Sequence, residues 1–363
     1  MDVGFRADAS VDIGTGHIMR CITLANALAA EGAHCRFYMR DLVGSMAQEV
    51  RSHGHAVSLL SGQSPADAAS GDLAHSHWLE TSWQHDAAQT LEASDGAPGL
   101  DWLVVDHYAL DHRWHNQLRA RAGRILVIDD LADRQLDCDV LLDQNTQIAK
   151  GRYDRIAPAD CLQLLGPRYA LLRPEFGRER CRTVRRAEAS VKRIFLFFGG
   201  SDLPGLTLLS LEALSTIVDA EGIEIDVLVG DANPDQARIA QWCSDRPQAH
   251  YRKRGADVCE LMARADIALG AGGTTTWERC CLGLPSIVVA IAENQLEGAR
   301  AVADAGACDY AGDWRTIDRA QIASAVDRLM RDPKRRRSIS EHGMALTDGR
   351  GADLVAMALK QDE

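Results

Sequence analysis

Short apolar segments alternate with helix-like stretches along this chain, and the alternation starts a second time near residue 193. Such alternation is typical of βαβ units and predicts largely parallel sheets. The first series predicts a helix over 17–30 and strands over 3–6, 35–39, 102–106, 124–129 and 140–143, the last of which would end the series. The second predicts a helix over 208–218 and strands over 194–198, 225–229, 267–269 and 286–291. We therefore expect the α/β class, with two Rossmann-like domains that face a cleft.

Length and composition shifts predict the domain boundaries. A chain of 363 residues exceeds the usual size of a single hydrophobic core. Arginines and X-Pro breakers gather between 166 and 192, as expected of a connector. We predict an N-terminal domain over 1–165 that carries a histidine loop, a connector over 166–192, and a C-terminal nucleotide-binding domain over 193–363 that ends in helices. The periodicity of residues 61–98 is weak, so we expect irregular helices or a long surface loop there. We expect the basic stretch 334–337 to be a solvated helix face.

Charge and cysteine usage disfavour several classes of function. The formal net charge of −12 opposes binding to nucleic acid and to anionic membrane surfaces. The sequence has no run of about 18 apolar residues that would predict a transmembrane helix. Its first residues lack the features of a secretory signal. The ten cysteines are scattered without a C-x-x-C pair, as expected of reduced thiols. We expect a cytoplasmic protein without stable membrane association, and the oligomeric state stays open.

A glycine-containing loop follows the first predicted strand and opens the first helix. It holds Gly14, Gly16 and His17, and its glycines allow the backbone to approach an anion closely. The loop imitates the dinucleotide fingerprint G-x-G-x-x-G, but Met19 replaces the third glycine, which disfavours nicotinamide binding. The positive end of the helix dipole disfavours a protonated His17 ring, so a neutral imidazole could accept a proton from water. A catalytic base is one interpretation, and a partly buried structural histidine is the other.

Two loops of the second half follow predicted strands and are rich in glycine and hydroxyl residues. Their candidate diphosphate-binding residues are Gly199, Gly200 and Ser201 in the first loop and Gly272, Gly273, Thr274 and Thr275 in the second. Hydroxyl residues can cap the following helix, whose first amides can bind a diphosphate, although turn geometry alone can also require glycine. Glu278, in the first turns of that helix, could accept two ribose hydroxyls, or could simply stabilise the helix terminus.

Polar side chains also follow the strand predicted over 286–291. Asn294 and Gln295 would lie at the carboxyl edge of the sheet, where they suit the hydroxyl or acetamido groups of a sugar. The start of the next helix is a nearly equal explanation for these two residues. The histidines show no metal-ligand spacing, so we predict no metal site.

Taken together, these segments resemble a known enzyme family over nearly the whole chain. The residues that carry the resemblance are 5–10 (Phe-Arg-Ala-Asp-Ala-Ser), 13–21, 106–108 (Asp-His-Tyr), 166–176 and the glycine-threonine stretch that ends at Glu278. The combination resembles the UDP-2,4-diacetamido-2,4,6-trideoxy-β-L-altropyranose hydrolases of pseudaminic acid biosynthesis. That family is similar to the two-domain glycosyltransferases of the B fold, including the transferase that makes lipid II.

The resemblance implies a role for each matching residue. His17 would be the base that activates water, Glu278 would bind the uridine ribose, and Arg168 would contact the nucleotide-sugar. Residues 199–202 and 272–276 would line the diphosphate. The other substrate-binding residues carried over are Arg6, Asp8, Tyr108, Tyr169 and Leu172. Water would attack the anomeric carbon with inversion and expel UDP, and neither a cofactor nor a metal is implied. This sequence has more residues over 61–98 and at the carboxyl end than compact members of the family have.

Three other functions use similar residues. A glycosyltransferase would pass the sugar to an acceptor other than water, and a hydrolysing UDP-N-acetylglucosamine 2-epimerase would release a sugar inverted at carbon 2. A nucleotide-sugar sensor without turnover would bind UDP and report to a partner. An acceptor-dependent transferase would be favoured by a hydrophobic patch with basic flanks, and none stands out in this acidic sequence.

Overall fold

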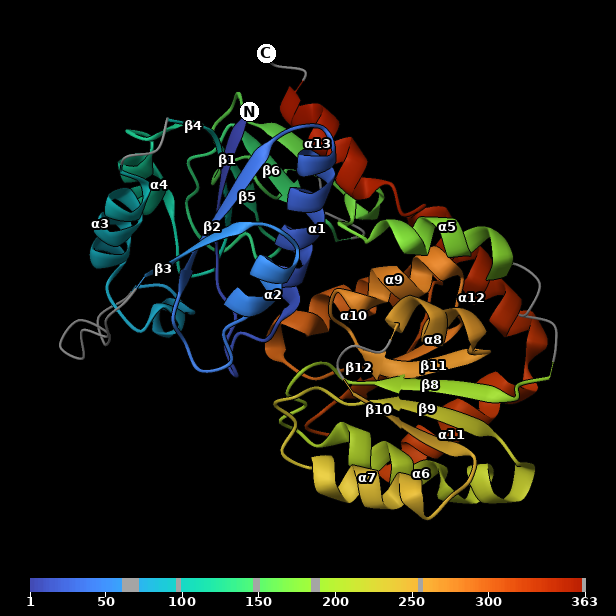
Figure 1. Cartoon of the computed structure of the whole chain (residues 1–363). Helices are drawn as coiled ribbons and strands as arrows, with labels where there is room; N and C mark the ends of the chain where they lie inside the picture. Colours follow the sequence, from blue (N-terminus) through green and yellow to red (C-terminus); the bar gives the residue numbers. More distant parts are fainter. Residues whose placement is uncertain (61–71, 96–98, 146–150, 184–189, 254–256, 361–363) are drawn as a thin grey trace. The chain divides into compact units, whose positions relative to one another are not determined.

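The computed structural model describes residues 1–60, 72–95, 99–145, 151–183, 190–253 and 257–360. The chain forms two compact units, one made of Met1–Leu171 with Gly351–Glu363 and the other of Leu172–Arg350 (Figure 1). Among the described residues, no helix combines the length and the apolar character that crossing a bilayer requires.

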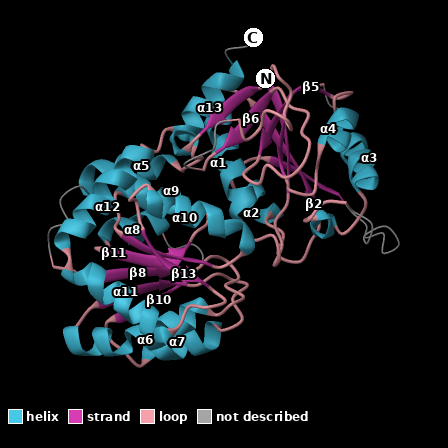
Figure 2. Ribbon diagram, turned by 180° about the vertical axis from the view of Figure 1, so that it is seen from behind, coloured by secondary structure: helices cyan, strands magenta, loops and turns pink. Residues whose placement is uncertain are grey.

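The first unit is built on a seven-stranded sheet in the order β3-β2-β1-β4-β5-β6-β7, and every neighbouring pair is parallel. Its strands are β1 (Asp2–Ala7), β2 (His34–Arg40), β3 (Ala56–Leu60), β4 (Leu100–Asp106), β5 (Ala122–Ile128), β6 (Val140–Asp143) and β7 (Leu162–Leu165). Its helices are α1 (Gly16–Ala30), α2 (Ala47–Ser52), α3 (Trp83–Ser94), α4 (His112–Leu118) and α13 (Gly351–Lys360), with short 3-10 turns η1 (Ser76–Leu79) and η2 (Pro167–Tyr169). Figures 1 and 2 show α1 and α13 on one side of the sheet and α3 and α4 on the other.

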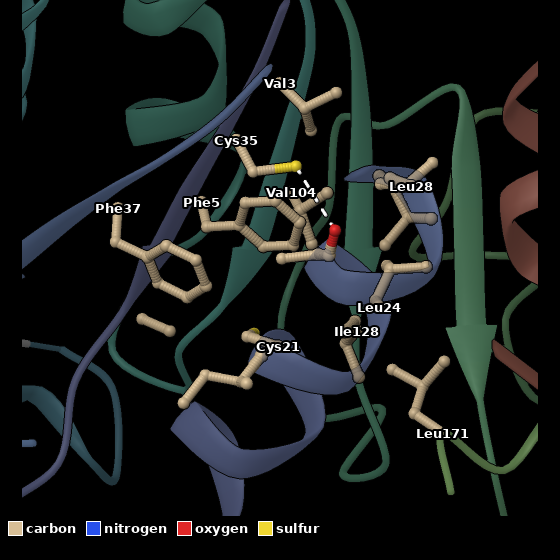
Figure 3. Close-up of a cluster of buried hydrophobic side chains, with 14 of the residues drawn as sticks. Val3, Phe5, Cys21, Leu24, Leu28, Cys35, Phe37, Val104, Ile128 and Leu171 are labelled. Carbon is tan, nitrogen blue, oxygen red and sulfur yellow. Dashed lines mark hydrogen bonds between the residues drawn. The ribbon is translucent and has the colours of Figure 1, made fainter. Parts of the chain in front are cut away.

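Apolar side chains of the central strands form the core of this unit beneath α1. Phe5 of β1 stacks on Phe37 of β2 with ring centroids 4.7 Å apart, and both are fully buried (Figure 3). Leu24 and Leu28 of α1 complete the same cluster, because residues three to four apart lie on one helix face. Burial of each such side chain stabilises the fold by about 1.5–3 kcal/mol. This burial holds α1, and therefore the loop before it, against the sheet.

The second unit is built on a six-stranded parallel sheet in the order β10-β9-β8-β11-β12-β13. Its strands are β8 (Arg193–Phe197), β9 (Glu224–Leu228), β10 (Ala249–Arg252), β11 (Ile267–Ala271), β12 (Ser286–Ala290) and β13 (Asp309–Asp313). Its helices are α5 (Pro174–Thr183), α6 (Leu206–Glu221), α7 (Gln236–Ser244), α8 (Val258–Arg264), α9 (Thr275–Leu282), α10 (Leu296–Asp304), α11 (Arg319–Arg331) and α12 (Pro333–Leu346), with the 3-10 turn η3 (Glu293–Gln295). Figures 1 and 2 show α6 and α7 on one side of the sheet and α8 and α9 on the other.

In each sheet the strand order reverses direction once. The reversal lies between β1 and β4 in the first unit and between β8 and β11 in the second. Loops that leave the carboxyl ends of strands on either side of such a point diverge, and ligands of open α/β sheets bind there. The loop before α1 follows β1, and the glycine-threonine loop before α9 follows β11, so both candidate loops lie at these points.

The expected α/β class with two parallel-sheet domains is confirmed, and several boundaries differ from expectation. β6 is not the last strand of the first unit, because β7 pairs with it. The predicted connector contains the helix α5, and the predicted terminal helices divide, because α13 belongs to the first unit and packs on α1. Of the region 61–98, the described part contains η1 and α3, while 61–71 and 96–98 lie outside the described residues.

The basic stretch 334–337 is only in part a solvated helix face. Arg336 is 2% exposed, and its Nη1 donates hydrogen bonds to the carbonyl oxygens of Leu329 and Met330. Its guanidinium therefore satisfies the last carbonyls of α11, which a helix end leaves without intrahelical partners.

Candidate functional site

His17 is the second residue of α1, and the end of β4 brings a carboxylate to its ring. Its Nδ1 lies 2.6 Å from Oδ1 of Asp106, the last residue of β4. The register of β1 and β4 pairs Ala7 with Asp106, so the carboxylate leaves its strand beside the loop that carries the histidine. His17 is 8% exposed and Asp106 is fully buried. The predicted position of His17 at a helix amino terminus is thus confirmed.

The guanidinium of Arg20, also on α1, keeps the carboxylate of Asp106 ionised. Arg20 donates from Nε to Oδ2 of Asp106 and from Nη2 to Oδ1, each over 2.6 Å. Burial alone would raise the pKa of Asp106, but the charges and hydrogen bonds of Arg20 and His17 hold it well below its usual range. Because two donors of one guanidinium meet two carboxylate oxygens, the pair also fixes the orientation of Asp106.

The ionised carboxylate determines which nitrogen of His17 carries the proton. An ionised Asp106 can only accept hydrogen bonds, so Nδ1 must donate to it. Nη2 of Arg20 lies 3.3 Å from the same Nδ1, but both are donors and this contact adds no hydrogen bond. In the neutral ring Nε2 is then the acceptor, which is the form that a general base needs.

Aromatic rings surround the imidazole. Tyr108 packs edge-on against His17 at 4.8 Å between centroids, and Trp78 of η1 does so at 5.9 Å. The hydroxyl of Tyr108 donates a short hydrogen bond to Asp130, whose carboxylate lies 3.7 Å from Nη1 of Arg20. Burial and the charge of Asp130 raise the pKa of Tyr108 well above its usual range, so its hydroxyl stays protonated. The structure therefore brings Tyr108, the last residue of the Asp-His-Tyr segment, to His17.

Arg6 and Asp8 occupy a different place from the one expected of substrate-binding residues. Both are fully buried, and Nη1 of Arg6 lies 2.8 Å from Oδ2 of Asp8. Arg6 also donates to both carboxylate oxygens of Asp86 on α3, and Nε2 of His107 lies 3.3 Å from Asp8. With no exposed surface, these side chains brace β1 against α3 and the end of β4 rather than offering groups to a ligand.

The remaining candidates lie at the loop before α1, on η2 and just after η2. Gly14 has a left-handed φ of 78° and donates its N–H to Ser10, which closes the turn before α1, and Gly16 is the first residue of α1. Arg168 is exposed on η2, with its guanidinium 4.9 Å from the ring centroid of Tyr169. Leu172, the first residue of the second unit, is 5% exposed and is therefore a buried apolar side chain.

In the second unit, the turn between β11 and α9 carries Gly272, Gly273, Thr274 and Thr275. Thr274 is the N-cap of α9, but its hydroxyl makes no capping hydrogen bond, contrary to the capping role expected of it. The first N–H groups of α9, at the positive end of the helix dipole, therefore receive no hydrogen bond from the Thr274 side chain. Gly272 packs so tightly that a side-chain carbon there would lie 3.1 Å from Ala299 Cβ.

Glu278 lies in the first turn of α9, as predicted, and is largely buried. Arg173 forms an ion pair with it, with Nη2 3.7 Å from Oε1. Its Oε2 is buried without a hydrogen-bond partner among the described residues. Burial raises the pKa of Glu278, and the charges of Arg173 and Arg279 oppose this shift. A buried oxygen with free lone pairs is an acceptor that a pair of hydroxyl groups could satisfy.

The loop after β8 differs from the turn before α9, because it supplies its own anion. Gly199 has a left-handed φ of 92°, and Gly200 is followed by Ser201 and Asp202. The buried carboxylate of Asp202 accepts hydrogen bonds from the N–H groups of Leu206 (2.9 Å) and Thr207 (2.8 Å) at the start of α6. The amino terminus of α6 is therefore already occupied by a carboxylate, which leaves only the loop itself for a phosphate.

Asn294 and Gln295 lie in η3, after β12. Asn294 is exposed, and Oε1 of Gln295 accepts the N–H of Ile291 over 3.2 Å. Nε2 of Gln295 lies 3.6 Å from where a side-chain carbon of Gly273 would stand, so its amide borders the turn before α9. Within the described ranges, no group of three or more His, Cys, Asp or Glu side chains is arranged to hold a metal ion.

Sequence reasoning missed several residues of this arrangement. Asp106 was noted only as part of a motif, although its place at the end of a strand next to the first one is a usable signal. Arg20 had a weaker signal, its spacing of three residues from His17 on one helix face. Trp78 had none, because it reaches the imidazole from a segment of weak periodicity.

Comparisons with known proteins agree with this geometry at the level of fold. Residues 194–349 match the glycosyltransferase family 28 C-terminal domain, which covers most of the second unit. The chain is 28% identical over 195 residues to the spore coat polysaccharide biosynthesis protein SpsG of Bacillus subtilis, over 54% of this chain and 57% of that protein. The alignment thus spans little more than half of the Bacillus protein.

Two further similarities extend over more of the chain. It is 25% identical over 244 residues to the UDP-2,4-diacetamido-2,4,6-trideoxy-β-L-altropyranose hydrolase of Campylobacter jejuni, over 67% of this chain and 74% of that protein. The solved structure of the spinosyn rhamnosyltransferase SpnG is similar over 99% of this chain and all of its own, with a TM-score of 0.65 and 17% identity. The chain therefore has a glycosyltransferase-like fold of the B type, with two parallel-sheet α/β domains of which the second matches the family 28 domain.

Proposed function

We propose that this protein hydrolyses a UDP-sugar to UDP and the free sugar, with His17 as the base that activates water. The observation that carries the proposal is the hydrogen bond of 2.6 Å between Nδ1 of His17 and the ionised Asp106. It leaves Nε2 as the acceptor and stabilises the imidazolium that forms when this nitrogen takes a proton.

The proposed step is one displacement at the anomeric carbon. Nε2 of His17 removes a proton from water while the water oxygen bonds to that carbon from the face opposite the nucleotide. The bond between the anomeric carbon and the diphosphate oxygen breaks, and UDP leaves with its electron pair. The sugar is released with inverted configuration, and the proton passes from His17 to solvent. UDP is a good leaving group, so the step needs a base, a positioned water and donors for the diphosphate.

In this proposal the second unit binds the nucleotide. The first amides of α9 bind the diphosphate, together with the loop of Gly199, Gly200 and Ser201, and the free Oε2 of Glu278 accepts the ribose hydroxyls. Asn294 and Gln295 of the same unit are further contacts of the nucleotide-sugar, and the resemblance also implies Arg168 and Tyr169 of the first unit. The 25% identity to the Campylobacter enzyme supports UDP-2,4-diacetamido-2,4,6-trideoxy-β-L-altropyranose as the substrate. Nine buried cysteines without disulfides in the described chain fit a reducing compartment, so we place the reaction in the cytoplasm.

The test compares the native protein with His17→Asn on that substrate, with no added metal. UDP release and the sugar product are followed by proton NMR, and the first anomer to appear reports inversion. We expect the variant to lose about 10²–10⁴-fold in rate, the usual contribution of a general base. Calorimetry with UDP should give the same affinity for both proteins. The matched control is His34→Asn, whose side chain is 85% exposed and remote from the site, and which should keep the native rate.

A second candidate is transfer of the sugar to an acceptor other than water, favoured by the family 28 domain of the second unit. If the folded native protein binds UDP but releases none from the substrate, hydrolysis is refuted and an acceptor-dependent transferase or a sensor takes its place. A product inverted at carbon 2 would point instead to a 2-epimerase. A His17→Asn variant that hydrolyses at the native rate would remove His17 from the mechanism while leaving the activity.

A further inference from the structure

A buried arginine without a carboxylate partner lies beneath the turn before α9. Arg279 is 1% exposed, and its Nη2 donates to the carbonyl oxygen of Ala271 over 2.7 Å and to Oγ1 of Thr276 over 3.0 Å. Its buried Nε has no hydrogen-bond partner. In the part of the chain that the structure describes, no carboxylate oxygen lies within the 4.0 Å of an ion pair with it, although Glu278 is near enough to act on its charge.

Burial of an uncompensated guanidinium opposes folding. Removal of a cation from water costs free energy that a carboxylate partner normally offsets, and Arg6, which is equally buried, has two such partners. An arginine stays charged even when burial lowers its pKa, as it does here. A positive charge without an ion-paired carboxylate therefore remains inside the second unit, and an anion bound nearby would stabilise it.

The surroundings of Arg279 direct that charge toward the turn. Ala271 ends β11 and Thr276 is in the first turn of α9, so the two hydrogen bonds place the guanidinium under the residues between them. The absence of a side chain at Gly270 makes room for it, because a side-chain carbon there would lie 2.9 Å from Nη1. The helix dipole of α9 adds positive potential at the same turn, and Thr274 supplies no hydroxyl cap.

The other helix that begins at the strand-order reversal shows the opposite arrangement. The amino terminus of α6 holds the carboxylate of Asp202, which is bound by two amides. The amino terminus of α9 has a buried cation and no carboxylate cap. Of these two helix ends, only that of α6 has its first amides bound to a carboxylate; Glu278 lies in the first turn of α9, but it does not cap the amides there.

We propose that Arg279 is a positioning residue for the diphosphate of the bound nucleotide, and that it supplies a desolvated positive charge behind the first amides of α9. The inference rests on the nucleotide site of the proposed function but not on hydrolysis. It predicts that the site discriminates ligands by phosphate charge, so that affinity rises from uridine through UMP to UDP mainly because of Arg279.

The test measures binding of uridine, UMP and UDP to the full chain by calorimetry, with the variants Arg279→Gln and Arg279→Lys. Gln keeps a hydrogen-bond donor but not the charge, and Lys keeps the charge. We expect Arg279→Gln to weaken UDP binding by about tenfold or more and UMP binding by less, since a buried charge interacts more strongly with the more highly charged ligand. Uridine affinity should stay within about twofold, and Arg279→Lys should restore most of the UDP affinity.

The matched control is Arg336→Gln, which removes a second buried guanidinium of the same unit that is bound to carbonyl oxygens of α11. It should lower thermal stability without changing the ratio of UDP to uridine affinity. Equal losses for uridine and UDP in Arg279→Gln would show that Arg279 only braces α9, and an unchanged UDP affinity would also overturn the proposal. If the native protein bound no UDP, the nucleotide site itself would be refuted. UDP binding without hydrolysis would refute only the proposed reaction.

Discussion

Asp143 is a fully buried carboxyl at the end of β6, and its environment makes stability depend on pH. Its Oδ1 accepts the N–H of Asn145 over 2.9 Å, and its Oδ2 lies 2.8 Å from the hydroxyl of Tyr153. Tyr153 donates this hydrogen bond to Asp143, and its hydroxyl also lies 3.3 Å from Oδ2 of Asp129. Burial, with a contribution from the charge of Asp130, raises the pKa of Asp143 to about 6.

The raised pKa predicts that this group destabilises the fold as pH rises. Between its ordinary pKa of 3.8 and about 6, the native state holds a proton that the unfolded chain has lost. The free energy of unfolding therefore falls through this window, by about 3 kcal/mol in full. Asp143→Asn removes the titration, so its stability relative to the native protein should increase by about that amount from pH 4 to pH 7.

Urea unfolding at several pH values measures this difference. Asp160→Asn is the control, because it removes one exposed carboxylate of the same unit and so reports the general effect of net charge. A stability difference between Asp143→Asn and the native protein that is the same at pH 4 and pH 7 would contradict the prediction.

Single residues of the candidate site could be predicted from the sequence only where a local pattern exposes them. His17 and Glu278 stand at the starts of helices that follow strands, so their positions follow from the local sequence alone. Arg6 and Asp8 belong to an equally recognisable segment, but Asp86, which binds Arg6 from α3, is 80 residues away, and no local pattern shows that contact. Long-range ion pairs decide which polar residues of a motif remain available to a ligand.

At the scale of elements, the strands that escaped prediction are the four sheet edges β3, β7, β10 and β13. Central strands such as β11 and β12 are buried at every position, and their continuous apolar runs were recognised. Edge strands pair on one side only and are partly solvated, so their sequences mix polar and apolar residues; β13 has no fully buried position. A strand can therefore be recognised in the sequence when its side chains are buried on both faces, whether or not it pairs with neighbours.

One buried carboxylate connects the β10 edge to the rest of its sheet. Asp226 of β9 is fully buried and binds Arg193 of β8 (2.9 Å), Arg252 of β10 (3.1 Å) and Arg264 of α8 (2.7 Å). Burial tends to raise the pKa of Asp226, but these arginines lower it below its ordinary value, so the carboxylate is ionised. Because the three arginines are partly exposed, they can turn to water when the carboxylate is removed, which moderates the loss.

We predict that Asp226→Ala lowers the free energy of unfolding by about 2 kcal/mol, since it removes charged hydrogen bonds from a buried position. Asp219→Ala is the matched control: that carboxylate is 51% exposed, and its removal from a surface pair with Arg246 should cost about 0.5 kcal/mol or less. Denaturant unfolding followed by circular dichroism compares the two. Equal losses would show that Asp226 contributes no more than a surface ion pair.

At the scale of the whole molecule, the first unit is made from two separate parts of the chain. The chain leaves it after Leu171 and returns at Gly351, so α13 completes a core begun some 350 residues earlier. Val355 and Leu359 of α13 are fully buried in the cluster that contains Phe5 and Leu24. The carbonyl oxygen of Leu359 accepts the indole N–H of Trp102 over 3.0 Å. The sequence could not predict that α13 packs in the first unit, because the apolar pattern of a helix does not show which core it joins.

This arrangement predicts that damage to α13 weakens the first unit and spares the second. Leu359→Ala should destabilise the first unit by about 3 kcal/mol, since it leaves a cavity in a packed core, whereas Met357→Ala, at a position 52% exposed on the same helix, should have little effect. Hydrogen exchange with mass spectrometry distinguishes the units, because faster exchange should appear in β1 and α1 but not in β8 and β12. UDP affinity should stay at the native value if the second unit alone binds the nucleotide. Equal acceleration of exchange in both sheets would mean that the two units unfold as one.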